Sequence, residues 1–279
     1  MIQLNNLTKT YDGKNVVDHL NLNIREKEIF ALLGPNGAGK TTTIRMLTML
    51  TKISEGSAYI NGYKVEKNNI QVKRSIGVVT QQSNMERELT AWENLELHGM
   101  LYQMNKEERR ERIRELLDYV GLTDKKDDKI ATFSGGMVRR MMIARSLMHK
   151  PRVLFLDEPT VGLDPQTRRR IWDLIKVMQQ EGMTVLLTTH YIEEAESLCG
   201  RVGIIDHGQL IALGTPQELQ EKTGSLVVEY LKDQVTERMF FANRSSALDY
   251  ANGLHTDFNV RATNLEDVFV QLTGRGVKS

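Results

Sequence analysis

Eight consecutive residues near the start of the chain fit the phosphate-binding pattern G-x-x-x-x-G-K-[ST] at every fixed position. They are Gly34, Pro35, Asn36, Gly37, Ala38, Gly39, Lys40 and Thr41. Backbone N–H groups of such a loop, and of the helix after it, carry partial positive charge, and glycines let a phosphate approach closely. Lys40 can reach terminal phosphates, and the Thr41 hydroxyl can bind Mg²⁺. The octet therefore predicts a nucleoside triphosphate site.

The residues on either side of the octet fit this interpretation. Ile29 to Leu33 form a short apolar run, which predicts a buried strand. After the octet, Ile44, Leu47 and Leu50 recur every three residues, which predicts a packed helix. The alternative is a glycine-rich turn between strand and helix that binds nothing, and the complete octet in these flanks favours the phosphate site.

Two acidic residues follow a second apolar strand. Asp157 and Glu158 come directly after residues 153–156, at the carboxyl edge of the expected sheet, where ligands collect in α/β proteins. An aspartate in this position typically holds Mg²⁺, and a second carboxylate can orient or deprotonate the attacking water. We assign Asp157 to the metal and Glu158 to the water. The alternative is a polar loop that begins with two acids.

A histidine follows the next predicted strand, residues 184–189. Because neighbouring parallel strands end at the same edge of a sheet, His190 should lie close to Asp157 and donate to a terminal phosphate. A loop histidine without a catalytic role is an equal alternative on this evidence alone.

A third glycine-rich segment, Phe133-Ser134-Gly135-Gly136-Met137, precedes a predicted helix over residues 138–148. Exposed amides of the two glycines could hold a phosphate supplied by another molecule. Spacing alone favours a simpler role, in which Ser134 caps the helix.

Several elements must position these residues. Alternation on either side of Asp12-Gly13 predicts an antiparallel pair within residues 2–24. Residues 153–189 predict a parallel βαβ unit whose helix begins at Asp164-Pro165. The 116 residues between Lys40 and Asp157 exceed one crossover, so we expect an insertion, with helices around residues 92–97 and over 105–120.

The remainder of the chain divides at about residue 220. A hairpin is predicted over residues 202–213, and Thr215 to Glu218 have the spacing of a helix-capping box. Residues 224–279 begin with a strand and end with a helix closed by Gly274, which predicts a small accessory α+β module.

Composition sets limits on function. The 279 residues are 40% hydrophobic and carry a net charge of +1, so no overall field attracts nucleic acid. The single cysteine, Cys199, cannot form an internal disulfide, which suits the cytosol. Residues 1–6 have neither the basic start nor the apolar core of a secretory signal, so we expect none, and no apolar run reaches the roughly 18 residues needed to cross a bilayer. We expect a soluble cytoplasmic chain whose contact with a membrane runs through a partner.

Taken together, these motifs resemble the ATPase subunit of an ATP-binding cassette (ABC) transporter over about residues 1–220. The resemblance consists of six motifs in the family's order: the octet, Gln81 after residues 78–80, the segment from Phe133 to Met137, Asp157-Glu158, Gly162-Leu163-Asp164, and His190. It implies a P-loop NTPase core with an N-terminal antiparallel β-subdomain and an inserted helical subdomain at about residues 83–150. It also implies ATP and Mg²⁺ as cofactors.

The resemblance also implies roles for individual residues. Tyr11 stacks on adenine, Thr42 joins the octet in binding nucleotide, and Gln81, with Gln82 as the neighbouring alternative, senses Mg²⁺ and the membrane partner. Ser134, Gly135 and Gly136 clamp ATP that is bound to a second copy, or to a similar subunit, and Asp164 lies at that dimer interface.

One position departs from the commonest family signature. Met137 stands where glutamine is usual, and together with Arg139-Arg140 it is similar to the drug-resistance and polysaccharide-exporter branch. The C-terminal end of the accessory module is similar to that branch too, in the segments Leu265 to Phe269 and Leu272-Thr273-Gly274-Arg275. The serine and both glycines remain, so we expect hydrolysis to be retained.

The sequence thus predicts a cytoplasmic ABC ATPase that dimerises around ATP and drives a separate integral-membrane permease, with export as the expected direction. One alternative is a soluble ABC protein that acts on nucleic acid or ribosomes, although such proteins usually carry two cassettes or a long coiled coil. A phosphate-loop GTPase would need N-K-x-D, and Asn105-Lys106-Glu107-Glu108 ends in the wrong acid.

Overall fold

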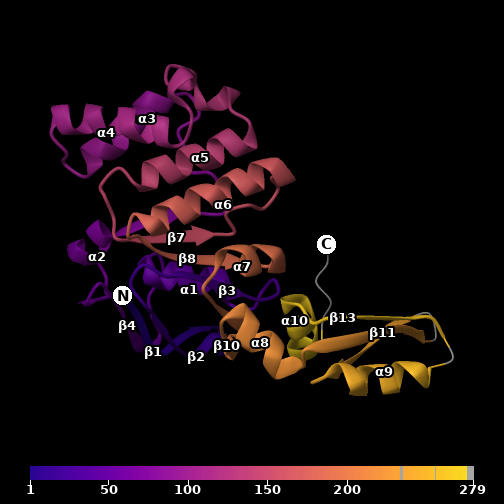
Figure 1. Ribbon diagram of the computed structural model, residues 1–279. Helices are drawn as coiled ribbons and strands as arrows, with labels where there is room; N and C mark the ends of the chain where they lie inside the picture. Colours follow the sequence, from indigo (N-terminus) through magenta and orange to yellow (C-terminus); the bar gives the residue numbers. More distant parts are fainter. Residues whose placement is uncertain (233–234, 255, 275–279) are drawn as a thin grey trace.

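The computed structural model describes residues 1–232, 235–254 and 256–274 (Figure 1), and Arg275 lies outside them. Three sheets organise these residues, in the strand orders β2-β1-β4-β5, β10-β9-β3-β8-β7-β6 and β12-β11-β13. Helices cover the six-stranded central sheet, while the third sheet projects to one side of it (Figure 1). The predicted mixed α/β architecture is confirmed. Within the described residues, no helix has the length and apolar character that crossing a bilayer requires.

The antiparallel sheet at the front of the chain forms as predicted. Strand β1 (Ile2–Tyr11) pairs antiparallel with β2 (Lys14–Ile24), so that Ile2 faces Ile24 and Leu4 faces Leu22 across the turn. Alternate residues of both strands are buried, because one face of the sheet packs against the central sheet.

The first part of the expected insertion, residues 55–79, differs from the prediction. We expected helices there, but the segment first returns to the front sheet as β4 (Glu55–Ile60), which pairs with β1, and β5 (Tyr63–Lys64). Helix α2 (Ile70–Ser75) and strand β6 (Ile76–Val79) follow, and β6 joins the edge of the central sheet beside β7. These short strands lack a clear alternation of apolar and polar residues. They form strands because they pair with strands that are distant in the sequence.

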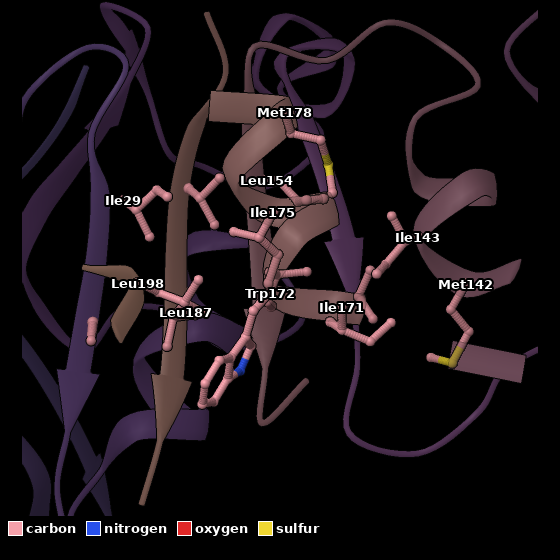
Figure 2. Packing of buried hydrophobic residues seen from close by; sticks show 14 of the residues in the cluster. Ile29, Met142, Ile143, Leu154, Ile171, Trp172, Ile175, Met178, Leu187 and Leu198 are labelled. Carbon is pink, nitrogen blue, oxygen red and sulfur yellow. The ribbon is translucent and has the colours of Figure 1, made fainter. Parts of the chain in front are cut away.

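The central sheet is parallel apart from one edge strand. Its strands are β3 (Ile29–Leu33), β8 (Thr184–Thr189), β7 (Val153–Asp157), β6 and β9 (Arg201–Asp206), with β10 (Gln209–Gly214) antiparallel at the edge. Helix α6 (Pro165–Gln180) connects β7 to β8, as the βαβ prediction requires. Figure 2 shows Trp172, Ile175 and Met178 along one face of α6, packed towards Leu154 and Leu187 of the sheet.

Helix α1 (Lys40–Leu47) is shorter than predicted, and the inclusion of Leu50 in its buried stripe is wrong. The Thr48 hydroxyl donates to Ile44 O at 2.8 Å, and Met49 adopts a left-handed conformation with φ 60°. The chain therefore leaves the helix, and Leu50 is 67% exposed.

The insertion does contain a helical region. It comprises α3 (Ala91–Leu101), α4 (Lys106–Tyr119), α5 (Gly135–Ser146) and the short 3₁₀ turns Thr123–Lys125 and Ile130–Thr132. In α4 most charged residues face solvent, Arg109 and Arg112 are partly buried, and Ile113, Leu116 and Leu117 are buried. These buried residues join α3 and α5 in the main hydrophobic core.

The C-terminal part begins after helix α7 (Ile192–Leu198) and the β9–β10 hairpin. Helix α8 (Pro216–Thr223) starts with the predicted capping box. Strands β11 (Leu226–Lys232), β12 (Val235–Phe241) and β13 (Phe258–Ala262) form the third sheet, which packs on α9 (Arg244–Asn252). Helix α10 (Leu265–Thr273) returns to the main core, where it buries Leu265, Val268 and Phe269 beside α8 (Figure 1).

Candidate nucleotide site

The phosphate loop connects β3 to α1 and needs glycine at two positions. A Cβ atom at Gly34 would lie 2.3 Å from Ile205 O, and one at Gly39 would lie 2.6 Å from Val16 O. Gly39 also caps α1 in a left-handed conformation, with φ 105°. Strands β2 and β9 therefore press against the loop and hold its backbone in place, with the first amides of α1 turned towards the loop.

The loop borders a pocket of about 320 Å³ to which three distant segments contribute. It is lined by Val16, Asn36, Gly37, Gly39, Lys40, Thr41, Thr42, Gln81 and Glu158. Most predicted site residues of the octet therefore meet Gln81 and Glu158 here, while Gly34, Pro35 and Ala38 support the loop from outside the lining. Gln82, the alternative to Gln81, does not line the pocket.

Lys40 is buried and is held by oxygen atoms on several sides. Its Nζ donates to Gly34 O at 2.7 Å and to Pro35 O at 3.1 Å, and it lies 3.6 Å from Glu158 Oε1. Burial lowers the pKa of this ammonium, and the charge of Glu158 opposes that effect. A cation that is only 5% exposed at a pocket wall is well placed to meet an anionic ligand.

Asp157 lies among hydroxyl groups at the end of β7. Its Oδ1 accepts hydrogen bonds from Thr41 Oγ1 at 3.1 Å and from Thr188 Oγ1 at 2.6 Å. Carboxylate and hydroxyl oxygens are ligands that Mg²⁺ prefers, and Mg²⁺ usually binds through one or two protein groups plus phosphate oxygens. The donor set fits such an ion. No group of three or more His, Cys, Asp or Glu side chains in the described part of the chain could hold a metal by itself.

Glu158 has an unusual backbone. Its φ is 49°, a conformation that costs a non-glycine residue roughly 1–3 kcal/mol and persists only when the surroundings enforce it. Its N–H donates to both Thr188 O, at 3.1 Å, and Thr188 Oγ1, at 3.2 Å. The conformation turns the carboxylate towards Lys40 and His190.

His190 lies beside Glu158 at the end of the neighbouring strand. Its Nδ1 is 2.8 Å from Glu158 Oε2, although the two groups are not aligned as a hydrogen bond, and Nδ1 has no other partner among the described residues. The ring packs against Tyr191 at 4.3 Å between centroids. The two strand ends therefore bring an acid and a histidine together, as the parallel βαβ unit predicts.

The backbone of Gln81 is held by an arginine that the sequence analysis did not select for the site. Arg139 of α5 is buried, and its guanidinium donates to Thr80 O at 2.8 Å and to Gln81 O at 3.1 Å. This contact connects the helix of the third glycine-rich segment to the segment that lines the pocket. The sequence feature that could have identified Arg139 is its position among the apolar residues of a predicted helix.

The third glycine-rich segment lies outside the pocket. Ser134 caps α5, with Oγ accepting from Met137 N at 3.3 Å, so the capping role that spacing favoured is present. Gly136 packs so tightly that a Cβ atom would lie 2.5 Å from Thr167 Cγ2. Ser134 and Gly135 remain exposed.

Two other predicted residues also lie away from the pocket lining. Asp164 caps α6 and accepts from Thr167 N at 2.9 Å. Tyr11 is 44% exposed, and Lys9 Nζ lies 4.7 Å above the centre of its ring. Neither residue touches the pocket within this single chain.

Thr188 is a further residue of the site that the sequence analysis missed. It contacts both predicted acids, through its hydroxyl to Asp157 and through its backbone and hydroxyl to Glu158. A threonine near the end of an apolar strand is common, because it also suits a sheet, so only the register of β7 against β8 identifies it.

Comparison with protein families agrees with this geometry. The family model described as "ABC transporter" matches residues 17–161, which include the octet, the third glycine-rich segment and both acids. A second model, described as an AAA domain of a putative AbiEii toxin of a type IV toxin–antitoxin system, matches the shorter segment 129–194.

Individual relatives cover most or all of the chain. The linearmycin resistance ATP-binding protein LnrL of Bacillus subtilis (strain 168) is 39% identical, with 100% of both chains covered. The daunorubicin/doxorubicin resistance ATP-binding protein DrrA of Streptomyces peucetius is 44% identical over 81% of this chain and 69% of its own. Among solved structures, the dimeric, ADP- and Pi-bound ATP-binding cassette MJ0796 is 33% identical, with a TM-score of 0.70 over 77% of this chain and 98% of its own.

Proposed function

Because the chain belongs to the ABC transporter family, as one of its ATP-binding and ATP-hydrolysing subunits, we propose that the pocket at the phosphate loop is its ATPase site. The observation that carries this proposal is the convergence of Lys40 and His190 on Glu158, from segments that are distant in sequence. Lys40 Nζ lies 3.6 Å from Glu158 Oε1, and His190 Nδ1 lies 2.8 Å from Glu158 Oε2. A cation for phosphate, a base for water and a neighbouring donor are the groups that ATP hydrolysis needs.

The phosphate loop would bind the phosphates of ATP. Asn36, Gly37 and Gly39 of the octet, together with Thr41 and Thr42 at the start of α1, line the pocket, and amides at the start of a helix favour anions. The ammonium of Lys40 would exchange its carbonyl partners, Gly34 O and Pro35 O, for charged phosphate oxygens, which are stronger acceptors. Tyr11 is proposed to contact adenine, following the family resemblance.

Mg²⁺ is proposed to bind through Thr41, Asp157 and Gln81. Thr41 Oγ1 and Asp157 Oδ1 are already 3.1 Å apart, and Gln81 lines the same pocket. When bound, the ion would neutralise charge on the phosphate oxygens. Thr188 would keep Asp157 oriented, because its hydroxyl donates to the carboxylate.

Glu158 is proposed to accept a proton from the attacking water. Its carboxylate is buried and lies between a lysine and a histidine, so it is oriented before any substrate arrives. His190 would then donate a hydrogen bond to the terminal phosphate and stabilise the negative charge that develops there in the transition state.

A second copy of the chain, or a similar subunit, is proposed to complete each site. Ser134 and Gly135 are exposed at the start of α5, where amides can bind an anion that belongs to another molecule. Asp164 caps the neighbouring helix α6, whose first turn packs through Thr167 against Gly136. The dimeric state of the similar cassette MJ0796 supports this arrangement.

The proposed biological role is to drive export through a separate integral-membrane permease, from a position at the cytoplasmic face of the membrane. The names of the resistance relatives support this role more than action on nucleic acid or ribosomes. In the proposed division of the chain, residues 1–220 form the ATPase domain, with a helical subdomain at about 83–150, and residues 224–279 form the accessory module. Copurification of a membrane protein with the tagged chain would support transport, whereas a ribosomal fraction would contradict it.

The substitution Glu158→Gln tests the catalytic assignment. We expect ATP turnover to fall about 10²- to 10⁴-fold while ATP binding remains, because the amide cannot accept the proton. ATP should then trap a dimer, which size-exclusion chromatography with light scattering would detect. The matched control is Glu181→Gln at the end of α6, which should leave turnover unchanged. Hydrolysis by Glu158→Gln at the parent rate would exclude Glu158 as the base.

A further inference from the structure

A buried carboxyl group outside the pocket connects the two segments that carry Glu158 and His190. Glu194 on α7 is 0% exposed, and its Oε1 accepts hydrogen bonds from Thr160 Oγ1 at 2.9 Å and from Trp172 Nε1 at 3.1 Å. Its Oε2 is buried without an aligned hydrogen bond among the described residues, and the Thr189 hydroxyl lies close enough to favour the charged form of the carboxyl group. Burial raises the pKa of this carboxyl group.

The hydrogen bond between Thr160 and Glu194 connects two segments that each carry a proposed catalytic residue. Thr160 follows Glu158 by two residues, in the turn after β7, and Glu194 follows His190 by four residues, in the helix after β8. One carboxyl oxygen therefore joins the turn that carries the acid to the helix that follows the histidine. Trp172, which Figure 2 labels, belongs to α6 and to neither of these two segments.

The turn at Glu158 needs contacts on both sides to keep its left-handed backbone. On its N-terminal side, the N–H of Glu158 is held by Thr188. On its C-terminal side, Thr160 is 0% exposed, and its hydroxyl donates to Glu194. Loss of Glu194 would leave this buried hydroxyl unpaired, and the C-terminal side of the turn would keep its backbone bonds from Val161 N to Glu158 O and from Leu163 N to Thr160 O.

We propose that Glu194 is a positioning residue for ATP hydrolysis, which holds the Glu158 turn against the His190 segment through its hydrogen bond with Thr160. The inference rests on the proposed roles of Glu158 and His190. Neither Glu194 nor Thr160 lines the pocket, so the effect falls on the geometry of the catalytic groups and leaves the phosphate loop untouched.

A purely structural role for Glu194 makes a different prediction, because Trp172 shares the same carboxyl oxygen. If Glu194 served only to satisfy buried polar groups, loss of either bond would lower stability alone. A positioning role requires that the Thr160 bond affects kcat and that the Trp172 bond does not.

The test compares isosteric substitutions in the full-length chain. Thr160→Val removes the hydroxyl with little change in shape, and Thr160→Ser retains it. We expect kcat to fall about 10- to 100-fold in Thr160→Val, since small displacements of catalytic groups have effects of this size, with KM for ATP within about threefold of the parent. Thr160→Ser should restore most of the rate. Melting temperature and binding of ATP measure folding independently.

Changes at Glu194 provide the second arm. Glu194→Ala should lower kcat like Thr160→Val, the double variant should lose no more than the single variant, and Glu194→Gln should retain activity because its amide oxygen still accepts from Thr160. Two controls should keep the parent kcat: Trp172→Phe, which removes the other hydrogen bond, and Glu193→Gln, which changes the adjacent, exposed acid.

The outcomes separate this inference from the proposed function. If Glu158→Gln blocks turnover while Thr160→Val keeps the parent kcat, the positioning role is overturned and the catalytic assignment stands. The positioning role is also overturned if Trp172→Phe lowers kcat as much as Thr160→Val does. Parent-rate hydrolysis by Glu158→Gln would overturn the role of Glu158 and this inference together.

Discussion

Two clusters of charged residues in this chain use the same chemical groups in different ways. The nucleotide-site cluster consists of Lys40, Asp157, Glu158 and His190 at the carboxyl edge of the central sheet. The C-terminal cluster consists of Glu229, Arg238, Arg261 and Asp267 between the third sheet and α10. Both contain buried carboxylates, yet their hydrogen bonding differs.

The C-terminal cluster is saturated by its own members. Arg261 donates to both oxygens of Asp267, at 2.7 and 2.9 Å, and to both oxygens of Glu229, at 2.7 and 3.2 Å. Arg238 adds a bond to Glu229 at 3.0 Å. Burial alone would raise the pKa of Asp267, but its bonds to Arg261 and the Asn264 amide lower it overall. Such planar, paired contacts stabilise a fold and leave little capacity for a ligand.

The nucleotide-site cluster retains bonding capacity. Glu158 meets Lys40 only at 3.6 Å, and its close contact with His190 is not aligned as a hydrogen bond. Lys40 donates to backbone carbonyls, which are weaker partners than phosphate oxygens. The comparison suggests a general criterion: buried charges that saturate one another support the fold, whereas buried charges with capacity left beside a pocket serve a ligand.

Among the substitutions that test this comparison between the two clusters, Lys40→Ala should have the largest effect. Loss of the ammonium removes the cation that is proposed to neutralise the terminal phosphates, so turnover should fall about 10²- to 10³-fold and ATP should bind more weakly. Isothermal titration with ATP and a phosphate-release assay measure the two effects. Lys14→Ala, at an exposed position of β2, is the matched control and should resemble the parent. Retention of ATP binding and turnover by Lys40→Ala would break the comparison between the clusters.

The next effect is expected from Asp267→Asn, and it should appear in stability alone. The substitution leaves Arg261 without one of its two carboxylates, and hydrogen bonds to charged groups contribute about 1.5–3 kcal/mol. We expect the free energy of unfolding to fall by about 2 kcal/mol, as chemical denaturation would show, with kcat unchanged. Glu266→Gln alters the neighbouring acid of α10, which lies outside the cluster, and should have an effect near zero.

The pH dependence of the stability lost in Asp267→Asn tests whether the charge of Asp267 is the cause of that loss. An acid whose pKa is lowered by folding stabilises the folded state above its unfolded pKa, which is about 4 for aspartate, and this stabilisation disappears as the pH falls through the folded pKa. The difference between the parent and Asp267→Asn should therefore be complete at pH 7 and shrink below about pH 4. A difference that stays constant to pH 3 would mean that the charge of Asp267 is not the cause.

Local sequence patterns predicted the residues that form the nucleotide site, but they did not predict the residues that hold those side chains and loops in place. The octet, the acids after β7 and the histidine after β8 are specified by short patterns, so their approach follows from a parallel βαβ unit. Thr188, Arg139 and Glu194 act through partners that are 31 to 59 residues away, and no local pattern encodes such contacts. For the same reason the pairing of β4 with β1 was missed.

The smallest effect is expected from Arg238→Met, which tests whether the C-terminal cluster is redundant. The methionine keeps most of the apolar stem, and Arg261 still pairs with both carboxylates, so the free energy of unfolding should fall by less than about 1 kcal/mol. Arg261→Met, the matched variant, removes the central donor and should resemble Asp267→Asn in the same denaturation experiment. If the two arginine variants lose equal stability, the bonds of Arg238 are as necessary as those of Arg261, and the cluster lacks the excess of donors that distinguishes it from the nucleotide site.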